Sequence, residues 1–245
     1  RGALRLLRTA DAPALAGLGL LFYALFPCLF TLALANTTAS RGAIALSTMP
    51  LLTLSLAVVA GAARFRWPRL AGVVLALTGV GLALMQSLGM TGQDTAWRGD
   101  LLMVATAALG AGYNVASRPY LRRNPVLAIT ALGMAIGAAV LAIATTATTG
   151  WSSLAAAPAS FWPAMLYLGV LGCAAPFWLW SAALERTQPT SVAVTVALNP
   201  VSAMLLGTYL LGEVVPLVLV LGLVAVLAGI VLANWPQADP RPQSS

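Results

Sequence analysis

The polar residues that could contact a solute are few, and they stand beside prolines inside long apolar stretches. Asn199 directly precedes Pro200. Ser47, Met49 and Pro50 form a matching group 150 residues earlier. A proline removes one helix hydrogen bond and frees the carbonyls before it, so each place offers polar groups within an apolar environment. These residues predict a cavity that binds a solute. The alternative, to which we give equal weight, is a kink that serves only helix packing.

An adjacent phenol and amide form a second candidate group. Tyr113 and Asn114 lie in the second half of the stretch 99–117, where they could hydrogen-bond a polar solute. The alternative is a hydrogen bond between helices, and it is slightly favoured for Asn114, which lies close to the end of its stretch. Gly133 and Gly137 have the spacing that lets two helices approach closely, but chance matches are expected in a chain so rich in Gly and Ala.

Aromatic side chains surround two further prolines, in the first and sixth apolar stretches. Tyr23 lies near one of them, and Trp178 lies just past the other, Pro176. Such rings could line a cavity for an amphipathic or aromatic solute. We assign Tyr23 and Trp178 to the cavity, and we expect their neighbours Phe177 and Trp180 to face lipid.

The composition argues against catalysis. The chain has no His and no Lys, so it cannot build a Ser-His pair, a His-liganded metal site or a Schiff base. Its four Asp residues lie at the ends of apolar stretches or between them, and no carboxylate lies at mid-depth. We therefore expect no enzyme, no cofactor and no metal site. Coupling to protons would need an acid at a span end or outside this sequence.

The apolar stretches predict membrane-spanning helices. Hydrophobic residues make up 60% of the 245 residues and charged residues only 8%, too few for the surface of a water-soluble domain. Most stretches hold enough residues to cross a hydrocarbon core of about 30 Å as helices. The predicted fold class is an all-α integral membrane bundle. We predict eight spans, at 14–35, 42–62, 69–88, 99–117, 125–147, 161–184, 191–211 and 215–234.

The arginines alternate between the breaks that separate the spans. All 13 basic residues are Arg, and only Arg41 and Arg98 fall on one side of the predicted topology, which leaves 11 on the other. Loops that stay in the cytoplasm carry this excess of basic residues. A basic surface for nucleic acid would not alternate loop by loop, so no nucleic acid is expected. We predict a plasma (inner) membrane protein with both termini cytoplasmic.

The chain contains an internal repeat. Pro50, Gly72 and Gly79 recur 150 residues later, and Pro27 recurs as Pro176. An odd number of spans separates the copies, so they cross the membrane in opposite senses, as in many secondary transporters. We predict an incomplete first repeat at 1–90 with three spans, a second repeat at 98–235 with five, and a disordered cytoplasmic tail at 236–245. Two spans of the first copy are expected to precede the sequence, which we interpret as a fragment.

These segments resemble the EamA-type members of the drug/metabolite transporter superfamily. The resemblance is carried by the small-residue segments Ala43–Pro50 and Val192–Pro200, by Leu211-Gly212-Glu213, and by the glycines of the last span. It implies two inverted five-span repeats, ten spans in the complete protein, and export of small solutes. Where the family commonly has a Glu in the first copy, this chain has Ala63 followed by Arg64.

The sequence thus favours a transporter, an exporter by resemblance, that moves a small metabolite, an amino acid or an amphipathic drug-like solute by alternating access. The expected partners are that solute, the lipid bilayer and, in a homodimer, a second copy of the chain. A membrane scaffold or accessory subunit is the first alternative, and an intramembrane enzyme is the second. The cavity is expected among spans one, two, four, six and seven, with Pro50 and Pro200 as flexing points.

Overall fold

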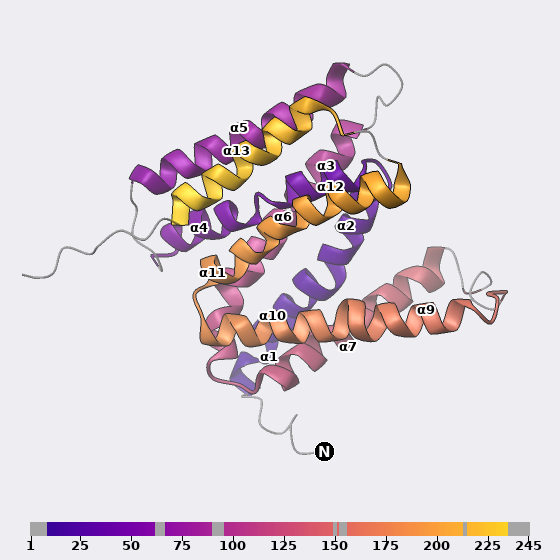
Figure 1. Cartoon of the computed structure of the whole chain (residues 1–245). Helices are drawn as coiled ribbons and strands as arrows, with labels where there is room; N and C mark the ends of the chain where they lie inside the picture. Colours follow the sequence, from indigo (N-terminus) through magenta and orange to yellow (C-terminus); the bar gives the residue numbers. More distant parts are fainter. Residues whose placement is uncertain are drawn as a thin grey trace, which may run out of the picture.

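A computed structural model describes residues 9–61, 67–89, 96–148, 151, 156–212 and 215–234, and within these ranges the regular structure is entirely helical (Figure 1). The elements in chain order are η2 (Thr9–Asp11), α1 (Ala12–Gly19), η3 (Leu20–Leu25), α2 (Phe26–Leu34), α3 (Ala39–Leu46), α4 (Met49–Val59), α5 (Trp67–Gly89), α6 (Ala96–Leu121), α7 (Val126–Thr148), α9 (Phe161–Tyr167), η4 (Leu168–Ala174), α10 (Ala175–Arg186), α11 (Pro189–Val194), η5 (Thr195–Ala197), α12 (Leu198–Leu211) and α13 (Leu217–Asn234).

The predicted fold class, an all-α polytopic membrane bundle, is confirmed. Four helical segments of the described chain are long and apolar enough to cross a membrane: Ala12–Leu34, Ala39–Val59, Val126–Thr148 and Phe161–Arg186. The division into repeats stays a prediction. The predicted tail at 236–245, Glu213, and the arginines at positions 1–8, 64 and 66 lie outside the described residues.

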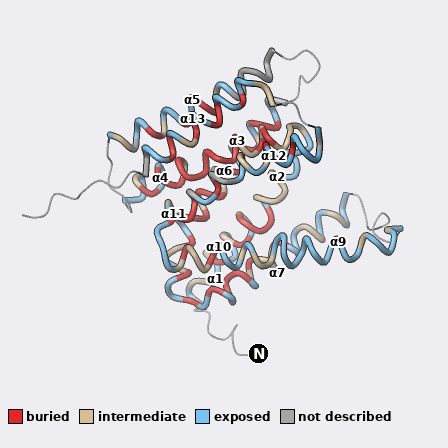
Figure 2. Tube along the Cα trace, viewed as in Figure 1, coloured by how far each residue is buried: buried red, intermediate tan, exposed pale blue. Residues whose placement is uncertain are grey.

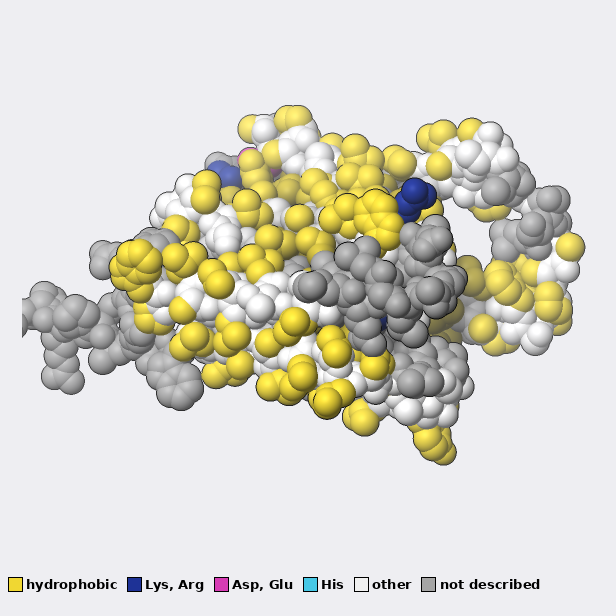
Figure 3. All heavy atoms as spheres, turned by 90° about the horizontal axis from the view of Figure 1, so that it is seen from above, with side chains coloured by type: hydrophobic (Ala, Val, Ile, Leu, Met, Phe, Trp, Pro, Cys, Tyr) yellow, Lys and Arg dark blue, Asp and Glu magenta, His cyan; other side chains and the backbone are white. Residues whose placement is uncertain are grey.

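Burial is concentrated in the middle of the bundle. Residues of α3, α4 and α6 are largely buried, whereas α9 has no buried residue (Figure 2). Many large hydrophobic side chains are exposed, and they spread over the face seen in Figure 3. A surface of this kind is stable against lipid, because the acyl chains are as apolar as the side chains.

Two equivalent prolines follow π-helical turns. The π-helical turn η3 ends directly before Phe26 and Pro27, and η4 ends directly before Ala175 and Pro176. A proline ring clashes with the carbonyl one turn earlier and donates no hydrogen bond to it, and a wider turn relieves both problems. The sequence therefore places the same irregularity in the first and the sixth span.

The other proline pair interrupts its spans in a different way. The second span breaks at Ser47 and Thr48, between α3 and α4, just before Pro50. The seventh span passes through the 3-10 turn η5 just before Pro200. Both spans thus leave α-helical geometry at mid-length, where carbonyls become available to other groups.

Helices α5 and α13 lie side by side along one edge of the bundle (Figure 1). A Cβ at Gly79 would lie 2.6 Å from the Gly222 carbonyl oxygen, and a Cβ at Gly229 would lie 2.5 Å from the Gly72 carbonyl oxygen. Position 72 meets 229 while position 79 meets 222, so the two helices run antiparallel. Glycine is required here because the backbones approach too closely for any side chain.

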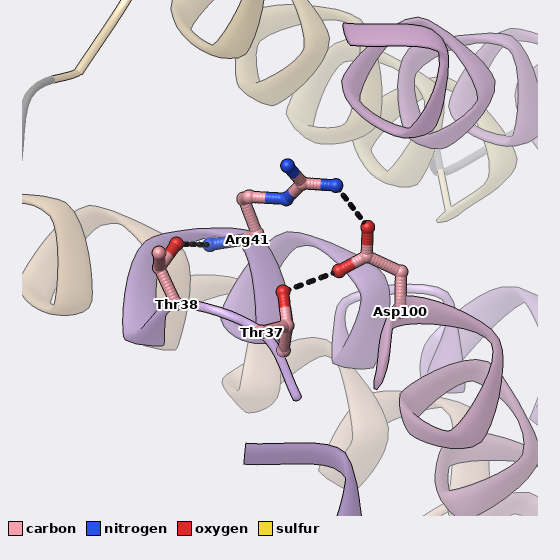
Figure 4. A network of polar contacts seen from close by, with 4 residues as sticks. All are labelled: Thr37, Thr38, Arg41 and Asp100. Atoms are coloured by element: carbon pink, nitrogen blue, oxygen red, sulfur yellow. Dashed lines mark hydrogen bonds and ion pairs between the residues drawn. The ribbon is translucent and has the colours of Figure 1, made fainter. Parts of the chain in front are cut away.

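A buried ion pair joins the start of α3 to the start of α6. Arg41 Nη2 donates to Asp100 Oδ2, and Thr37 Oγ1 donates to Asp100 Oδ1 at 2.6 Å (Figure 4). The side chains of Arg41 and Asp100 are only 11% and 3% exposed. The Thr38 hydroxyl caps α3 by accepting from the Arg41 backbone N–H. The pair therefore connects segments that are far apart in the sequence.

We predict that Gly79→Ala lowers the free energy of unfolding by about 1–3 kcal/mol, because its methyl group would meet backbone rather than a flexible side chain. Gly81→Ala is the matched control on the same helix, since a Cβ there meets nothing within 4 Å. Denaturant unfolding in detergent micelles measures both variants. Equal stabilities of the two variants would contradict the close backbone approach.

We also predict that Arg41→Gln destabilises the protein by about 3 kcal/mol, because it leaves the Asp100 carboxylate buried without its counter-charge. The double variant Arg41→Met/Asp100→Leu should recover most of that loss, since it removes both charges. Arg186→Gln is the control, because that arginine is 80% exposed beside Glu185 and should change stability by less than about 1 kcal/mol. A double variant as unstable as Arg41→Gln would exclude this interpretation.

Candidate functional site

Three hydroxyl groups meet inside the bundle. The Tyr23 and Tyr113 oxygens are 3.3 Å apart, and Ser181 Oγ lies 3.4 Å from Tyr23 Oη and 3.3 Å from Tyr113 Oη. The three residues come from η3, α6 and α10 and are buried. Each hydroxyl has one proton to donate and lone pairs to accept, so a head-to-tail ring can satisfy all three. This cluster joins the first, fourth and sixth spans by neutral hydrogen bonds.

Two glycines of α7 make room for Tyr23. A Cβ at Gly133 would lie 2.5 Å from the Tyr23 ring, and a Cβ at Gly137 would overlap the Tyr23 backbone carbonyl. On the other side, Phe22 stacks on Tyr113 with ring centroids 4.0 Å apart. The glycine spacing therefore accommodates the π-helical turn η3 rather than a second regular helix.

A buried amide links three spans. Trp180 Nε1 donates to Asn114 Oδ1 at 2.9 Å, and Asn114 Nδ2 donates to Thr53 Oγ1 at 3.3 Å. Asn114 is fully buried. Both ends of its amide are bonded, so Asn114 connects α6 to α10 and α4. This is the role in interhelical hydrogen bonding that the sequence suggested as the alternative to solute binding.

A cleft of about 420 Å³ lies beside these two networks. Its lining comes from the first, second, sixth and seventh spans and is dominated by aromatic and aliphatic side chains. The lining residues are Phe22, Phe26, Pro27, Phe30, Leu46, Met49, Gly172, Cys173, Pro176, Phe177, Trp180, Val196 and Asn199. None of them is charged, and Asn199 contributes an amide group that could contact a polar solute. Such a cleft suits a solute with an apolar or aromatic body and a small polar group.

Equivalent positions of the two predicted repeats line the cleft together. Met49 and Asn199 both line it, as do Leu46 and Val196, and each pair is separated by 150 residues. Pro27 and Pro176, 149 residues apart, line it as well. Inverted repeats would place a site of this composition between the two copies, and the division into repeats stays a prediction.

The predicted site residues differ in how they lie relative to the cleft. Met49 and Asn199 line the cleft, while Tyr23, Tyr113 and Asn114 lie directly behind it in the two networks. Pro50 and Pro200 are buried next to the lining residues. Ser47 is fully buried, and its hydroxyl donates to the Ala43 carbonyl of its own helix at 2.8 Å.

The sixth span differs from expectation at its aromatic residues. Trp178 is 43% exposed and does not line the cleft, whereas Phe177 and Trp180, assigned to lipid from the sequence, do line it. The cause is the π-helical turn η4, which adds residues to a turn and so rotates the positions that follow. Ser181 and Thr53 were missed altogether, because an isolated hydroxyl in a span carries no distinctive signal.

Comparison with known proteins identifies the fold's family. A model of the EamA-like transporter family matches residues 2–85 and 97–235. The chain belongs to the EamA-like transporter family.

Individual relatives of this EamA-like transporter agree with that assignment. The chain is 31% identical over 229 residues to an uncharacterized transporter of Archaeoglobus fulgidus, covering 91% of this chain and 75% of the relative. It is 25% identical over 238 residues to a Streptantibioticus cattleyicolor protein named "Probable terminal-alkyne amino-acid exporter", covering 97% and 78%. A solved crystal structure has a TM-score of 0.64 at 22% identity, over 94% of this chain and 78% of that one, and shares the fold. The protein is a multi-pass membrane transporter.

We predict that substitutions of Trp180 and Asn114 have non-additive effects on the free energy of unfolding, because the two residues share a hydrogen bond. Trp180→Phe and Asn114→Leu should each cost about 1 kcal/mol of unfolding free energy, because each breaks a buried hydrogen bond. The double variant should cost clearly less than the sum, since the first substitution already removes the shared bond. Trp162→Phe, at a half-exposed ring, is the control. Additive losses in the double-mutant cycle would count against the bond.

Proposed function

We propose that this EamA-like transporter moves a small amphipathic solute, such as an amino acid with an apolar side chain, through the central cleft by alternating access. The observation that carries the proposal is the lining itself: aromatic rings and one amide, contributed by equivalent positions of the two predicted repeats. Apolar burial would hold the body of the solute, and Asn199 would fix its polar end. The name of the S. cattleyicolor relative supports an amino acid and the export direction.

The irregular turns support a rocking motion of the spans that line the cleft. Pro27, Pro50, Pro176 and Pro200 each follow a departure from α-helical geometry, and all four border the cleft or its lining residues. Such points absorb backbone rotation at low cost. We infer that the spans bend there when the cleft changes the side from which it is open.

The hydroxyl cluster lies on the arginine side of the cleft. Tyr113 precedes Arg118 by five residues, and Ser181 precedes Arg186 by five. We propose the plasma (inner) membrane with both termini cytoplasmic, on the 11 to 2 distribution of arginines. In that orientation, the contact of Tyr23, Tyr113 and Ser181 would close the cytoplasmic side of the cleft, and opening it would break only neutral hydrogen bonds.

The proposal predicts saturable flux that depends on Asn199. Protein reconstituted in liposomes, and tested with a panel of aromatic and aliphatic amino acids, should transport at least one of them. Asn199→Ala should raise its half-saturation concentration by about tenfold, because a bound polar group would lose its partner. Trp178→Phe is the control outside the cleft. Absence of saturable flux would favour the scaffold alternative, and unchanged flux and affinity in both Asn199→Ala and Tyr113→Phe would exclude the proposed site.

Cys173 offers a second readout, because it lines the cleft while Cys28 does not. In a Cys28→Ser background, a membrane-permeant thiol reagent should modify Cys173 and block flux. A transported solute should slow that modification severalfold by occupying the cleft. Modification of Cys173 at the same rate with and without saturating solute would place the solute elsewhere.

A further inference from the structure

A second cleft lies at the arginine end of the bundle, apart from the central cleft. Its volume is about 680 Å³, and it lies among the end of α4, the end of α6 and the start of α11. Arg118, Arg122 and Arg123 line it together with Gln188 and Thr190, and the remaining lining residues are apolar. Three guanidinium groups therefore share one concave surface, which we call the arginine cleft.

The arginines of this cleft are placed close to one another despite their like charge. Arg118 and Arg122 stand four residues apart, near the end of α6, where two like charges destabilise a helix. Partial burial, and then the charge of Arg122, lower the pKa of Arg118 from its ordinary value. A bound anion would remove this unfavourable interaction between the two charges.

Within the described part of the chain, neighbouring groups compensate Arg123 but leave the Nε of Arg118 without an acceptor. Arg123 Nε donates to the Pro119 carbonyl at 2.9 Å, and its Nη2 lies 3.9 Å from Asp11. Arg118 Nε is buried and has no hydrogen-bond partner among the described residues. No acidic residue is among those that line the arginine cleft. A cleft lined by arginines and by no acidic residue suits a ligand with acceptor oxygens.

General rules explain only part of this arrangement. Arginines are common at helix C-termini and in cytoplasmic loops, where the helix dipole and the topology favour them. Such arginines need not converge, as Arg186 shows: it lies at the same end of the bundle, is 80% exposed, and has Glu185 beside it. The convergence of three arginines on one cleft is what requires a further explanation.

We propose that the arginine cleft binds an anionic group, a carboxylate or a phosphate, carried by a lipid headgroup or by a free solute. Guanidinium groups match these planar or tetrahedral oxyanions with paired hydrogen bonds. Gln188 and Thr190 add neutral polar groups, and the apolar lining residues would contact the attached carbon chain. This site goes beyond the proposed transport function and does not depend on it.

The location gives the site a connection to the central cleft. Val115 of the arginine cleft is adjacent to Asn114, and Ala57 lies one turn after Thr53. The hydrogen-bonded residues Thr53, Asn114 and Trp180 therefore connect segments that line both clefts, and Trp180 itself lines the central one.

Binding is tested on the purified protein without any flux measurement. For the lipid source, native mass spectrometry compares retention of phosphatidylglycerol with that of phosphatidylcholine. For the free source, inorganic phosphate and acetate are compared with chloride at equal ionic strength for their effect on the melting temperature. Arg118→Gln and Arg122→Gln should each weaken anion binding by about tenfold, the loss expected for one charge-assisted hydrogen bond. Arg186→Gln, at the same end of the bundle, should leave it unchanged.

Either source alone supports the site. Preferential phosphatidylglycerol retention that phosphate does not displace identifies a headgroup, and a thermal shift by phosphate or acetate identifies a free anion. Unchanged elution and an unchanged melting temperature of the Gln variants in chloride show that their losses do not come from misfolding. The proposal is overturned if wild-type protein prefers neither anion, or if the Gln variants at 118 and 122 bind as wild type does.

Discussion

Inside a bilayer, every backbone or side-chain polar group must find its partner within the protein, and this constraint organises the bundle. The mid-span prolines interrupt the regular hydrogen bonds of their helices, and hydroxyl groups close to these prolines donate to carbonyls of the preceding helix turn. Thr31 donates to the Pro27 carbonyl at 2.8 Å, Thr48 to Ala45 at 2.8 Å, and Thr195 to Val192 at 2.7 Å. The irregular turns are thus stabilised locally, which lets them persist at the depth where a solute would bind.

Because unpartnered polar groups are costly in a bilayer, glycine and proline rather than charged residues define the architecture of the bundle. The reciprocal approach of Gly72 to Gly229 and of Gly79 to Gly222 is the contact expected when a two-fold axis relates two copies of a helix. The pairs Leu46 with Val196 and Met49 with Asn199 border the cleft under the same relation. Glycines thus allow the close packing of α5 against α13, whereas the segments that carry Pro50 and Pro200 border a cleft.

The sequence predicted the fold class and the positions of the helices, because hydropathy and the length of apolar stretches are read directly from it. Four of the eight predicted spans are long and apolar enough in the described residues to cross a membrane. Of the five spans expected around the cavity, the first, second, sixth and seventh line the cleft and the fourth does not. The sequence did not predict which face of the sixth span lines the cleft. From the sequence, Trp178 is assigned to the cleft because it lies just past Pro176, whereas the structure places Phe177 and Trp180 in the lining, after the π-helical turn η4. The partners of polar residues were also beyond the sequence: Asp100 was recognised only as lying near a span end, and its pairing with Arg41 depends on how α3 and α6 pack.

The charges at the two ends of the bundle have different consequences for a change of conformation. A transporter must keep its two states within a few kcal/mol of each other, or one of them would be unpopulated. At one end, Arg41 and Asp100 form a buried pair whose mutual attraction is offset by the cost of removing both charges from water, so the pair need not lock one state. Towards the other end, the Tyr23–Tyr113–Ser181 cluster uses neutral hydrogen bonds, each worth only about 1 kcal/mol net. Contacts of this modest net strength on both sides of a neutral cleft would allow either side to open.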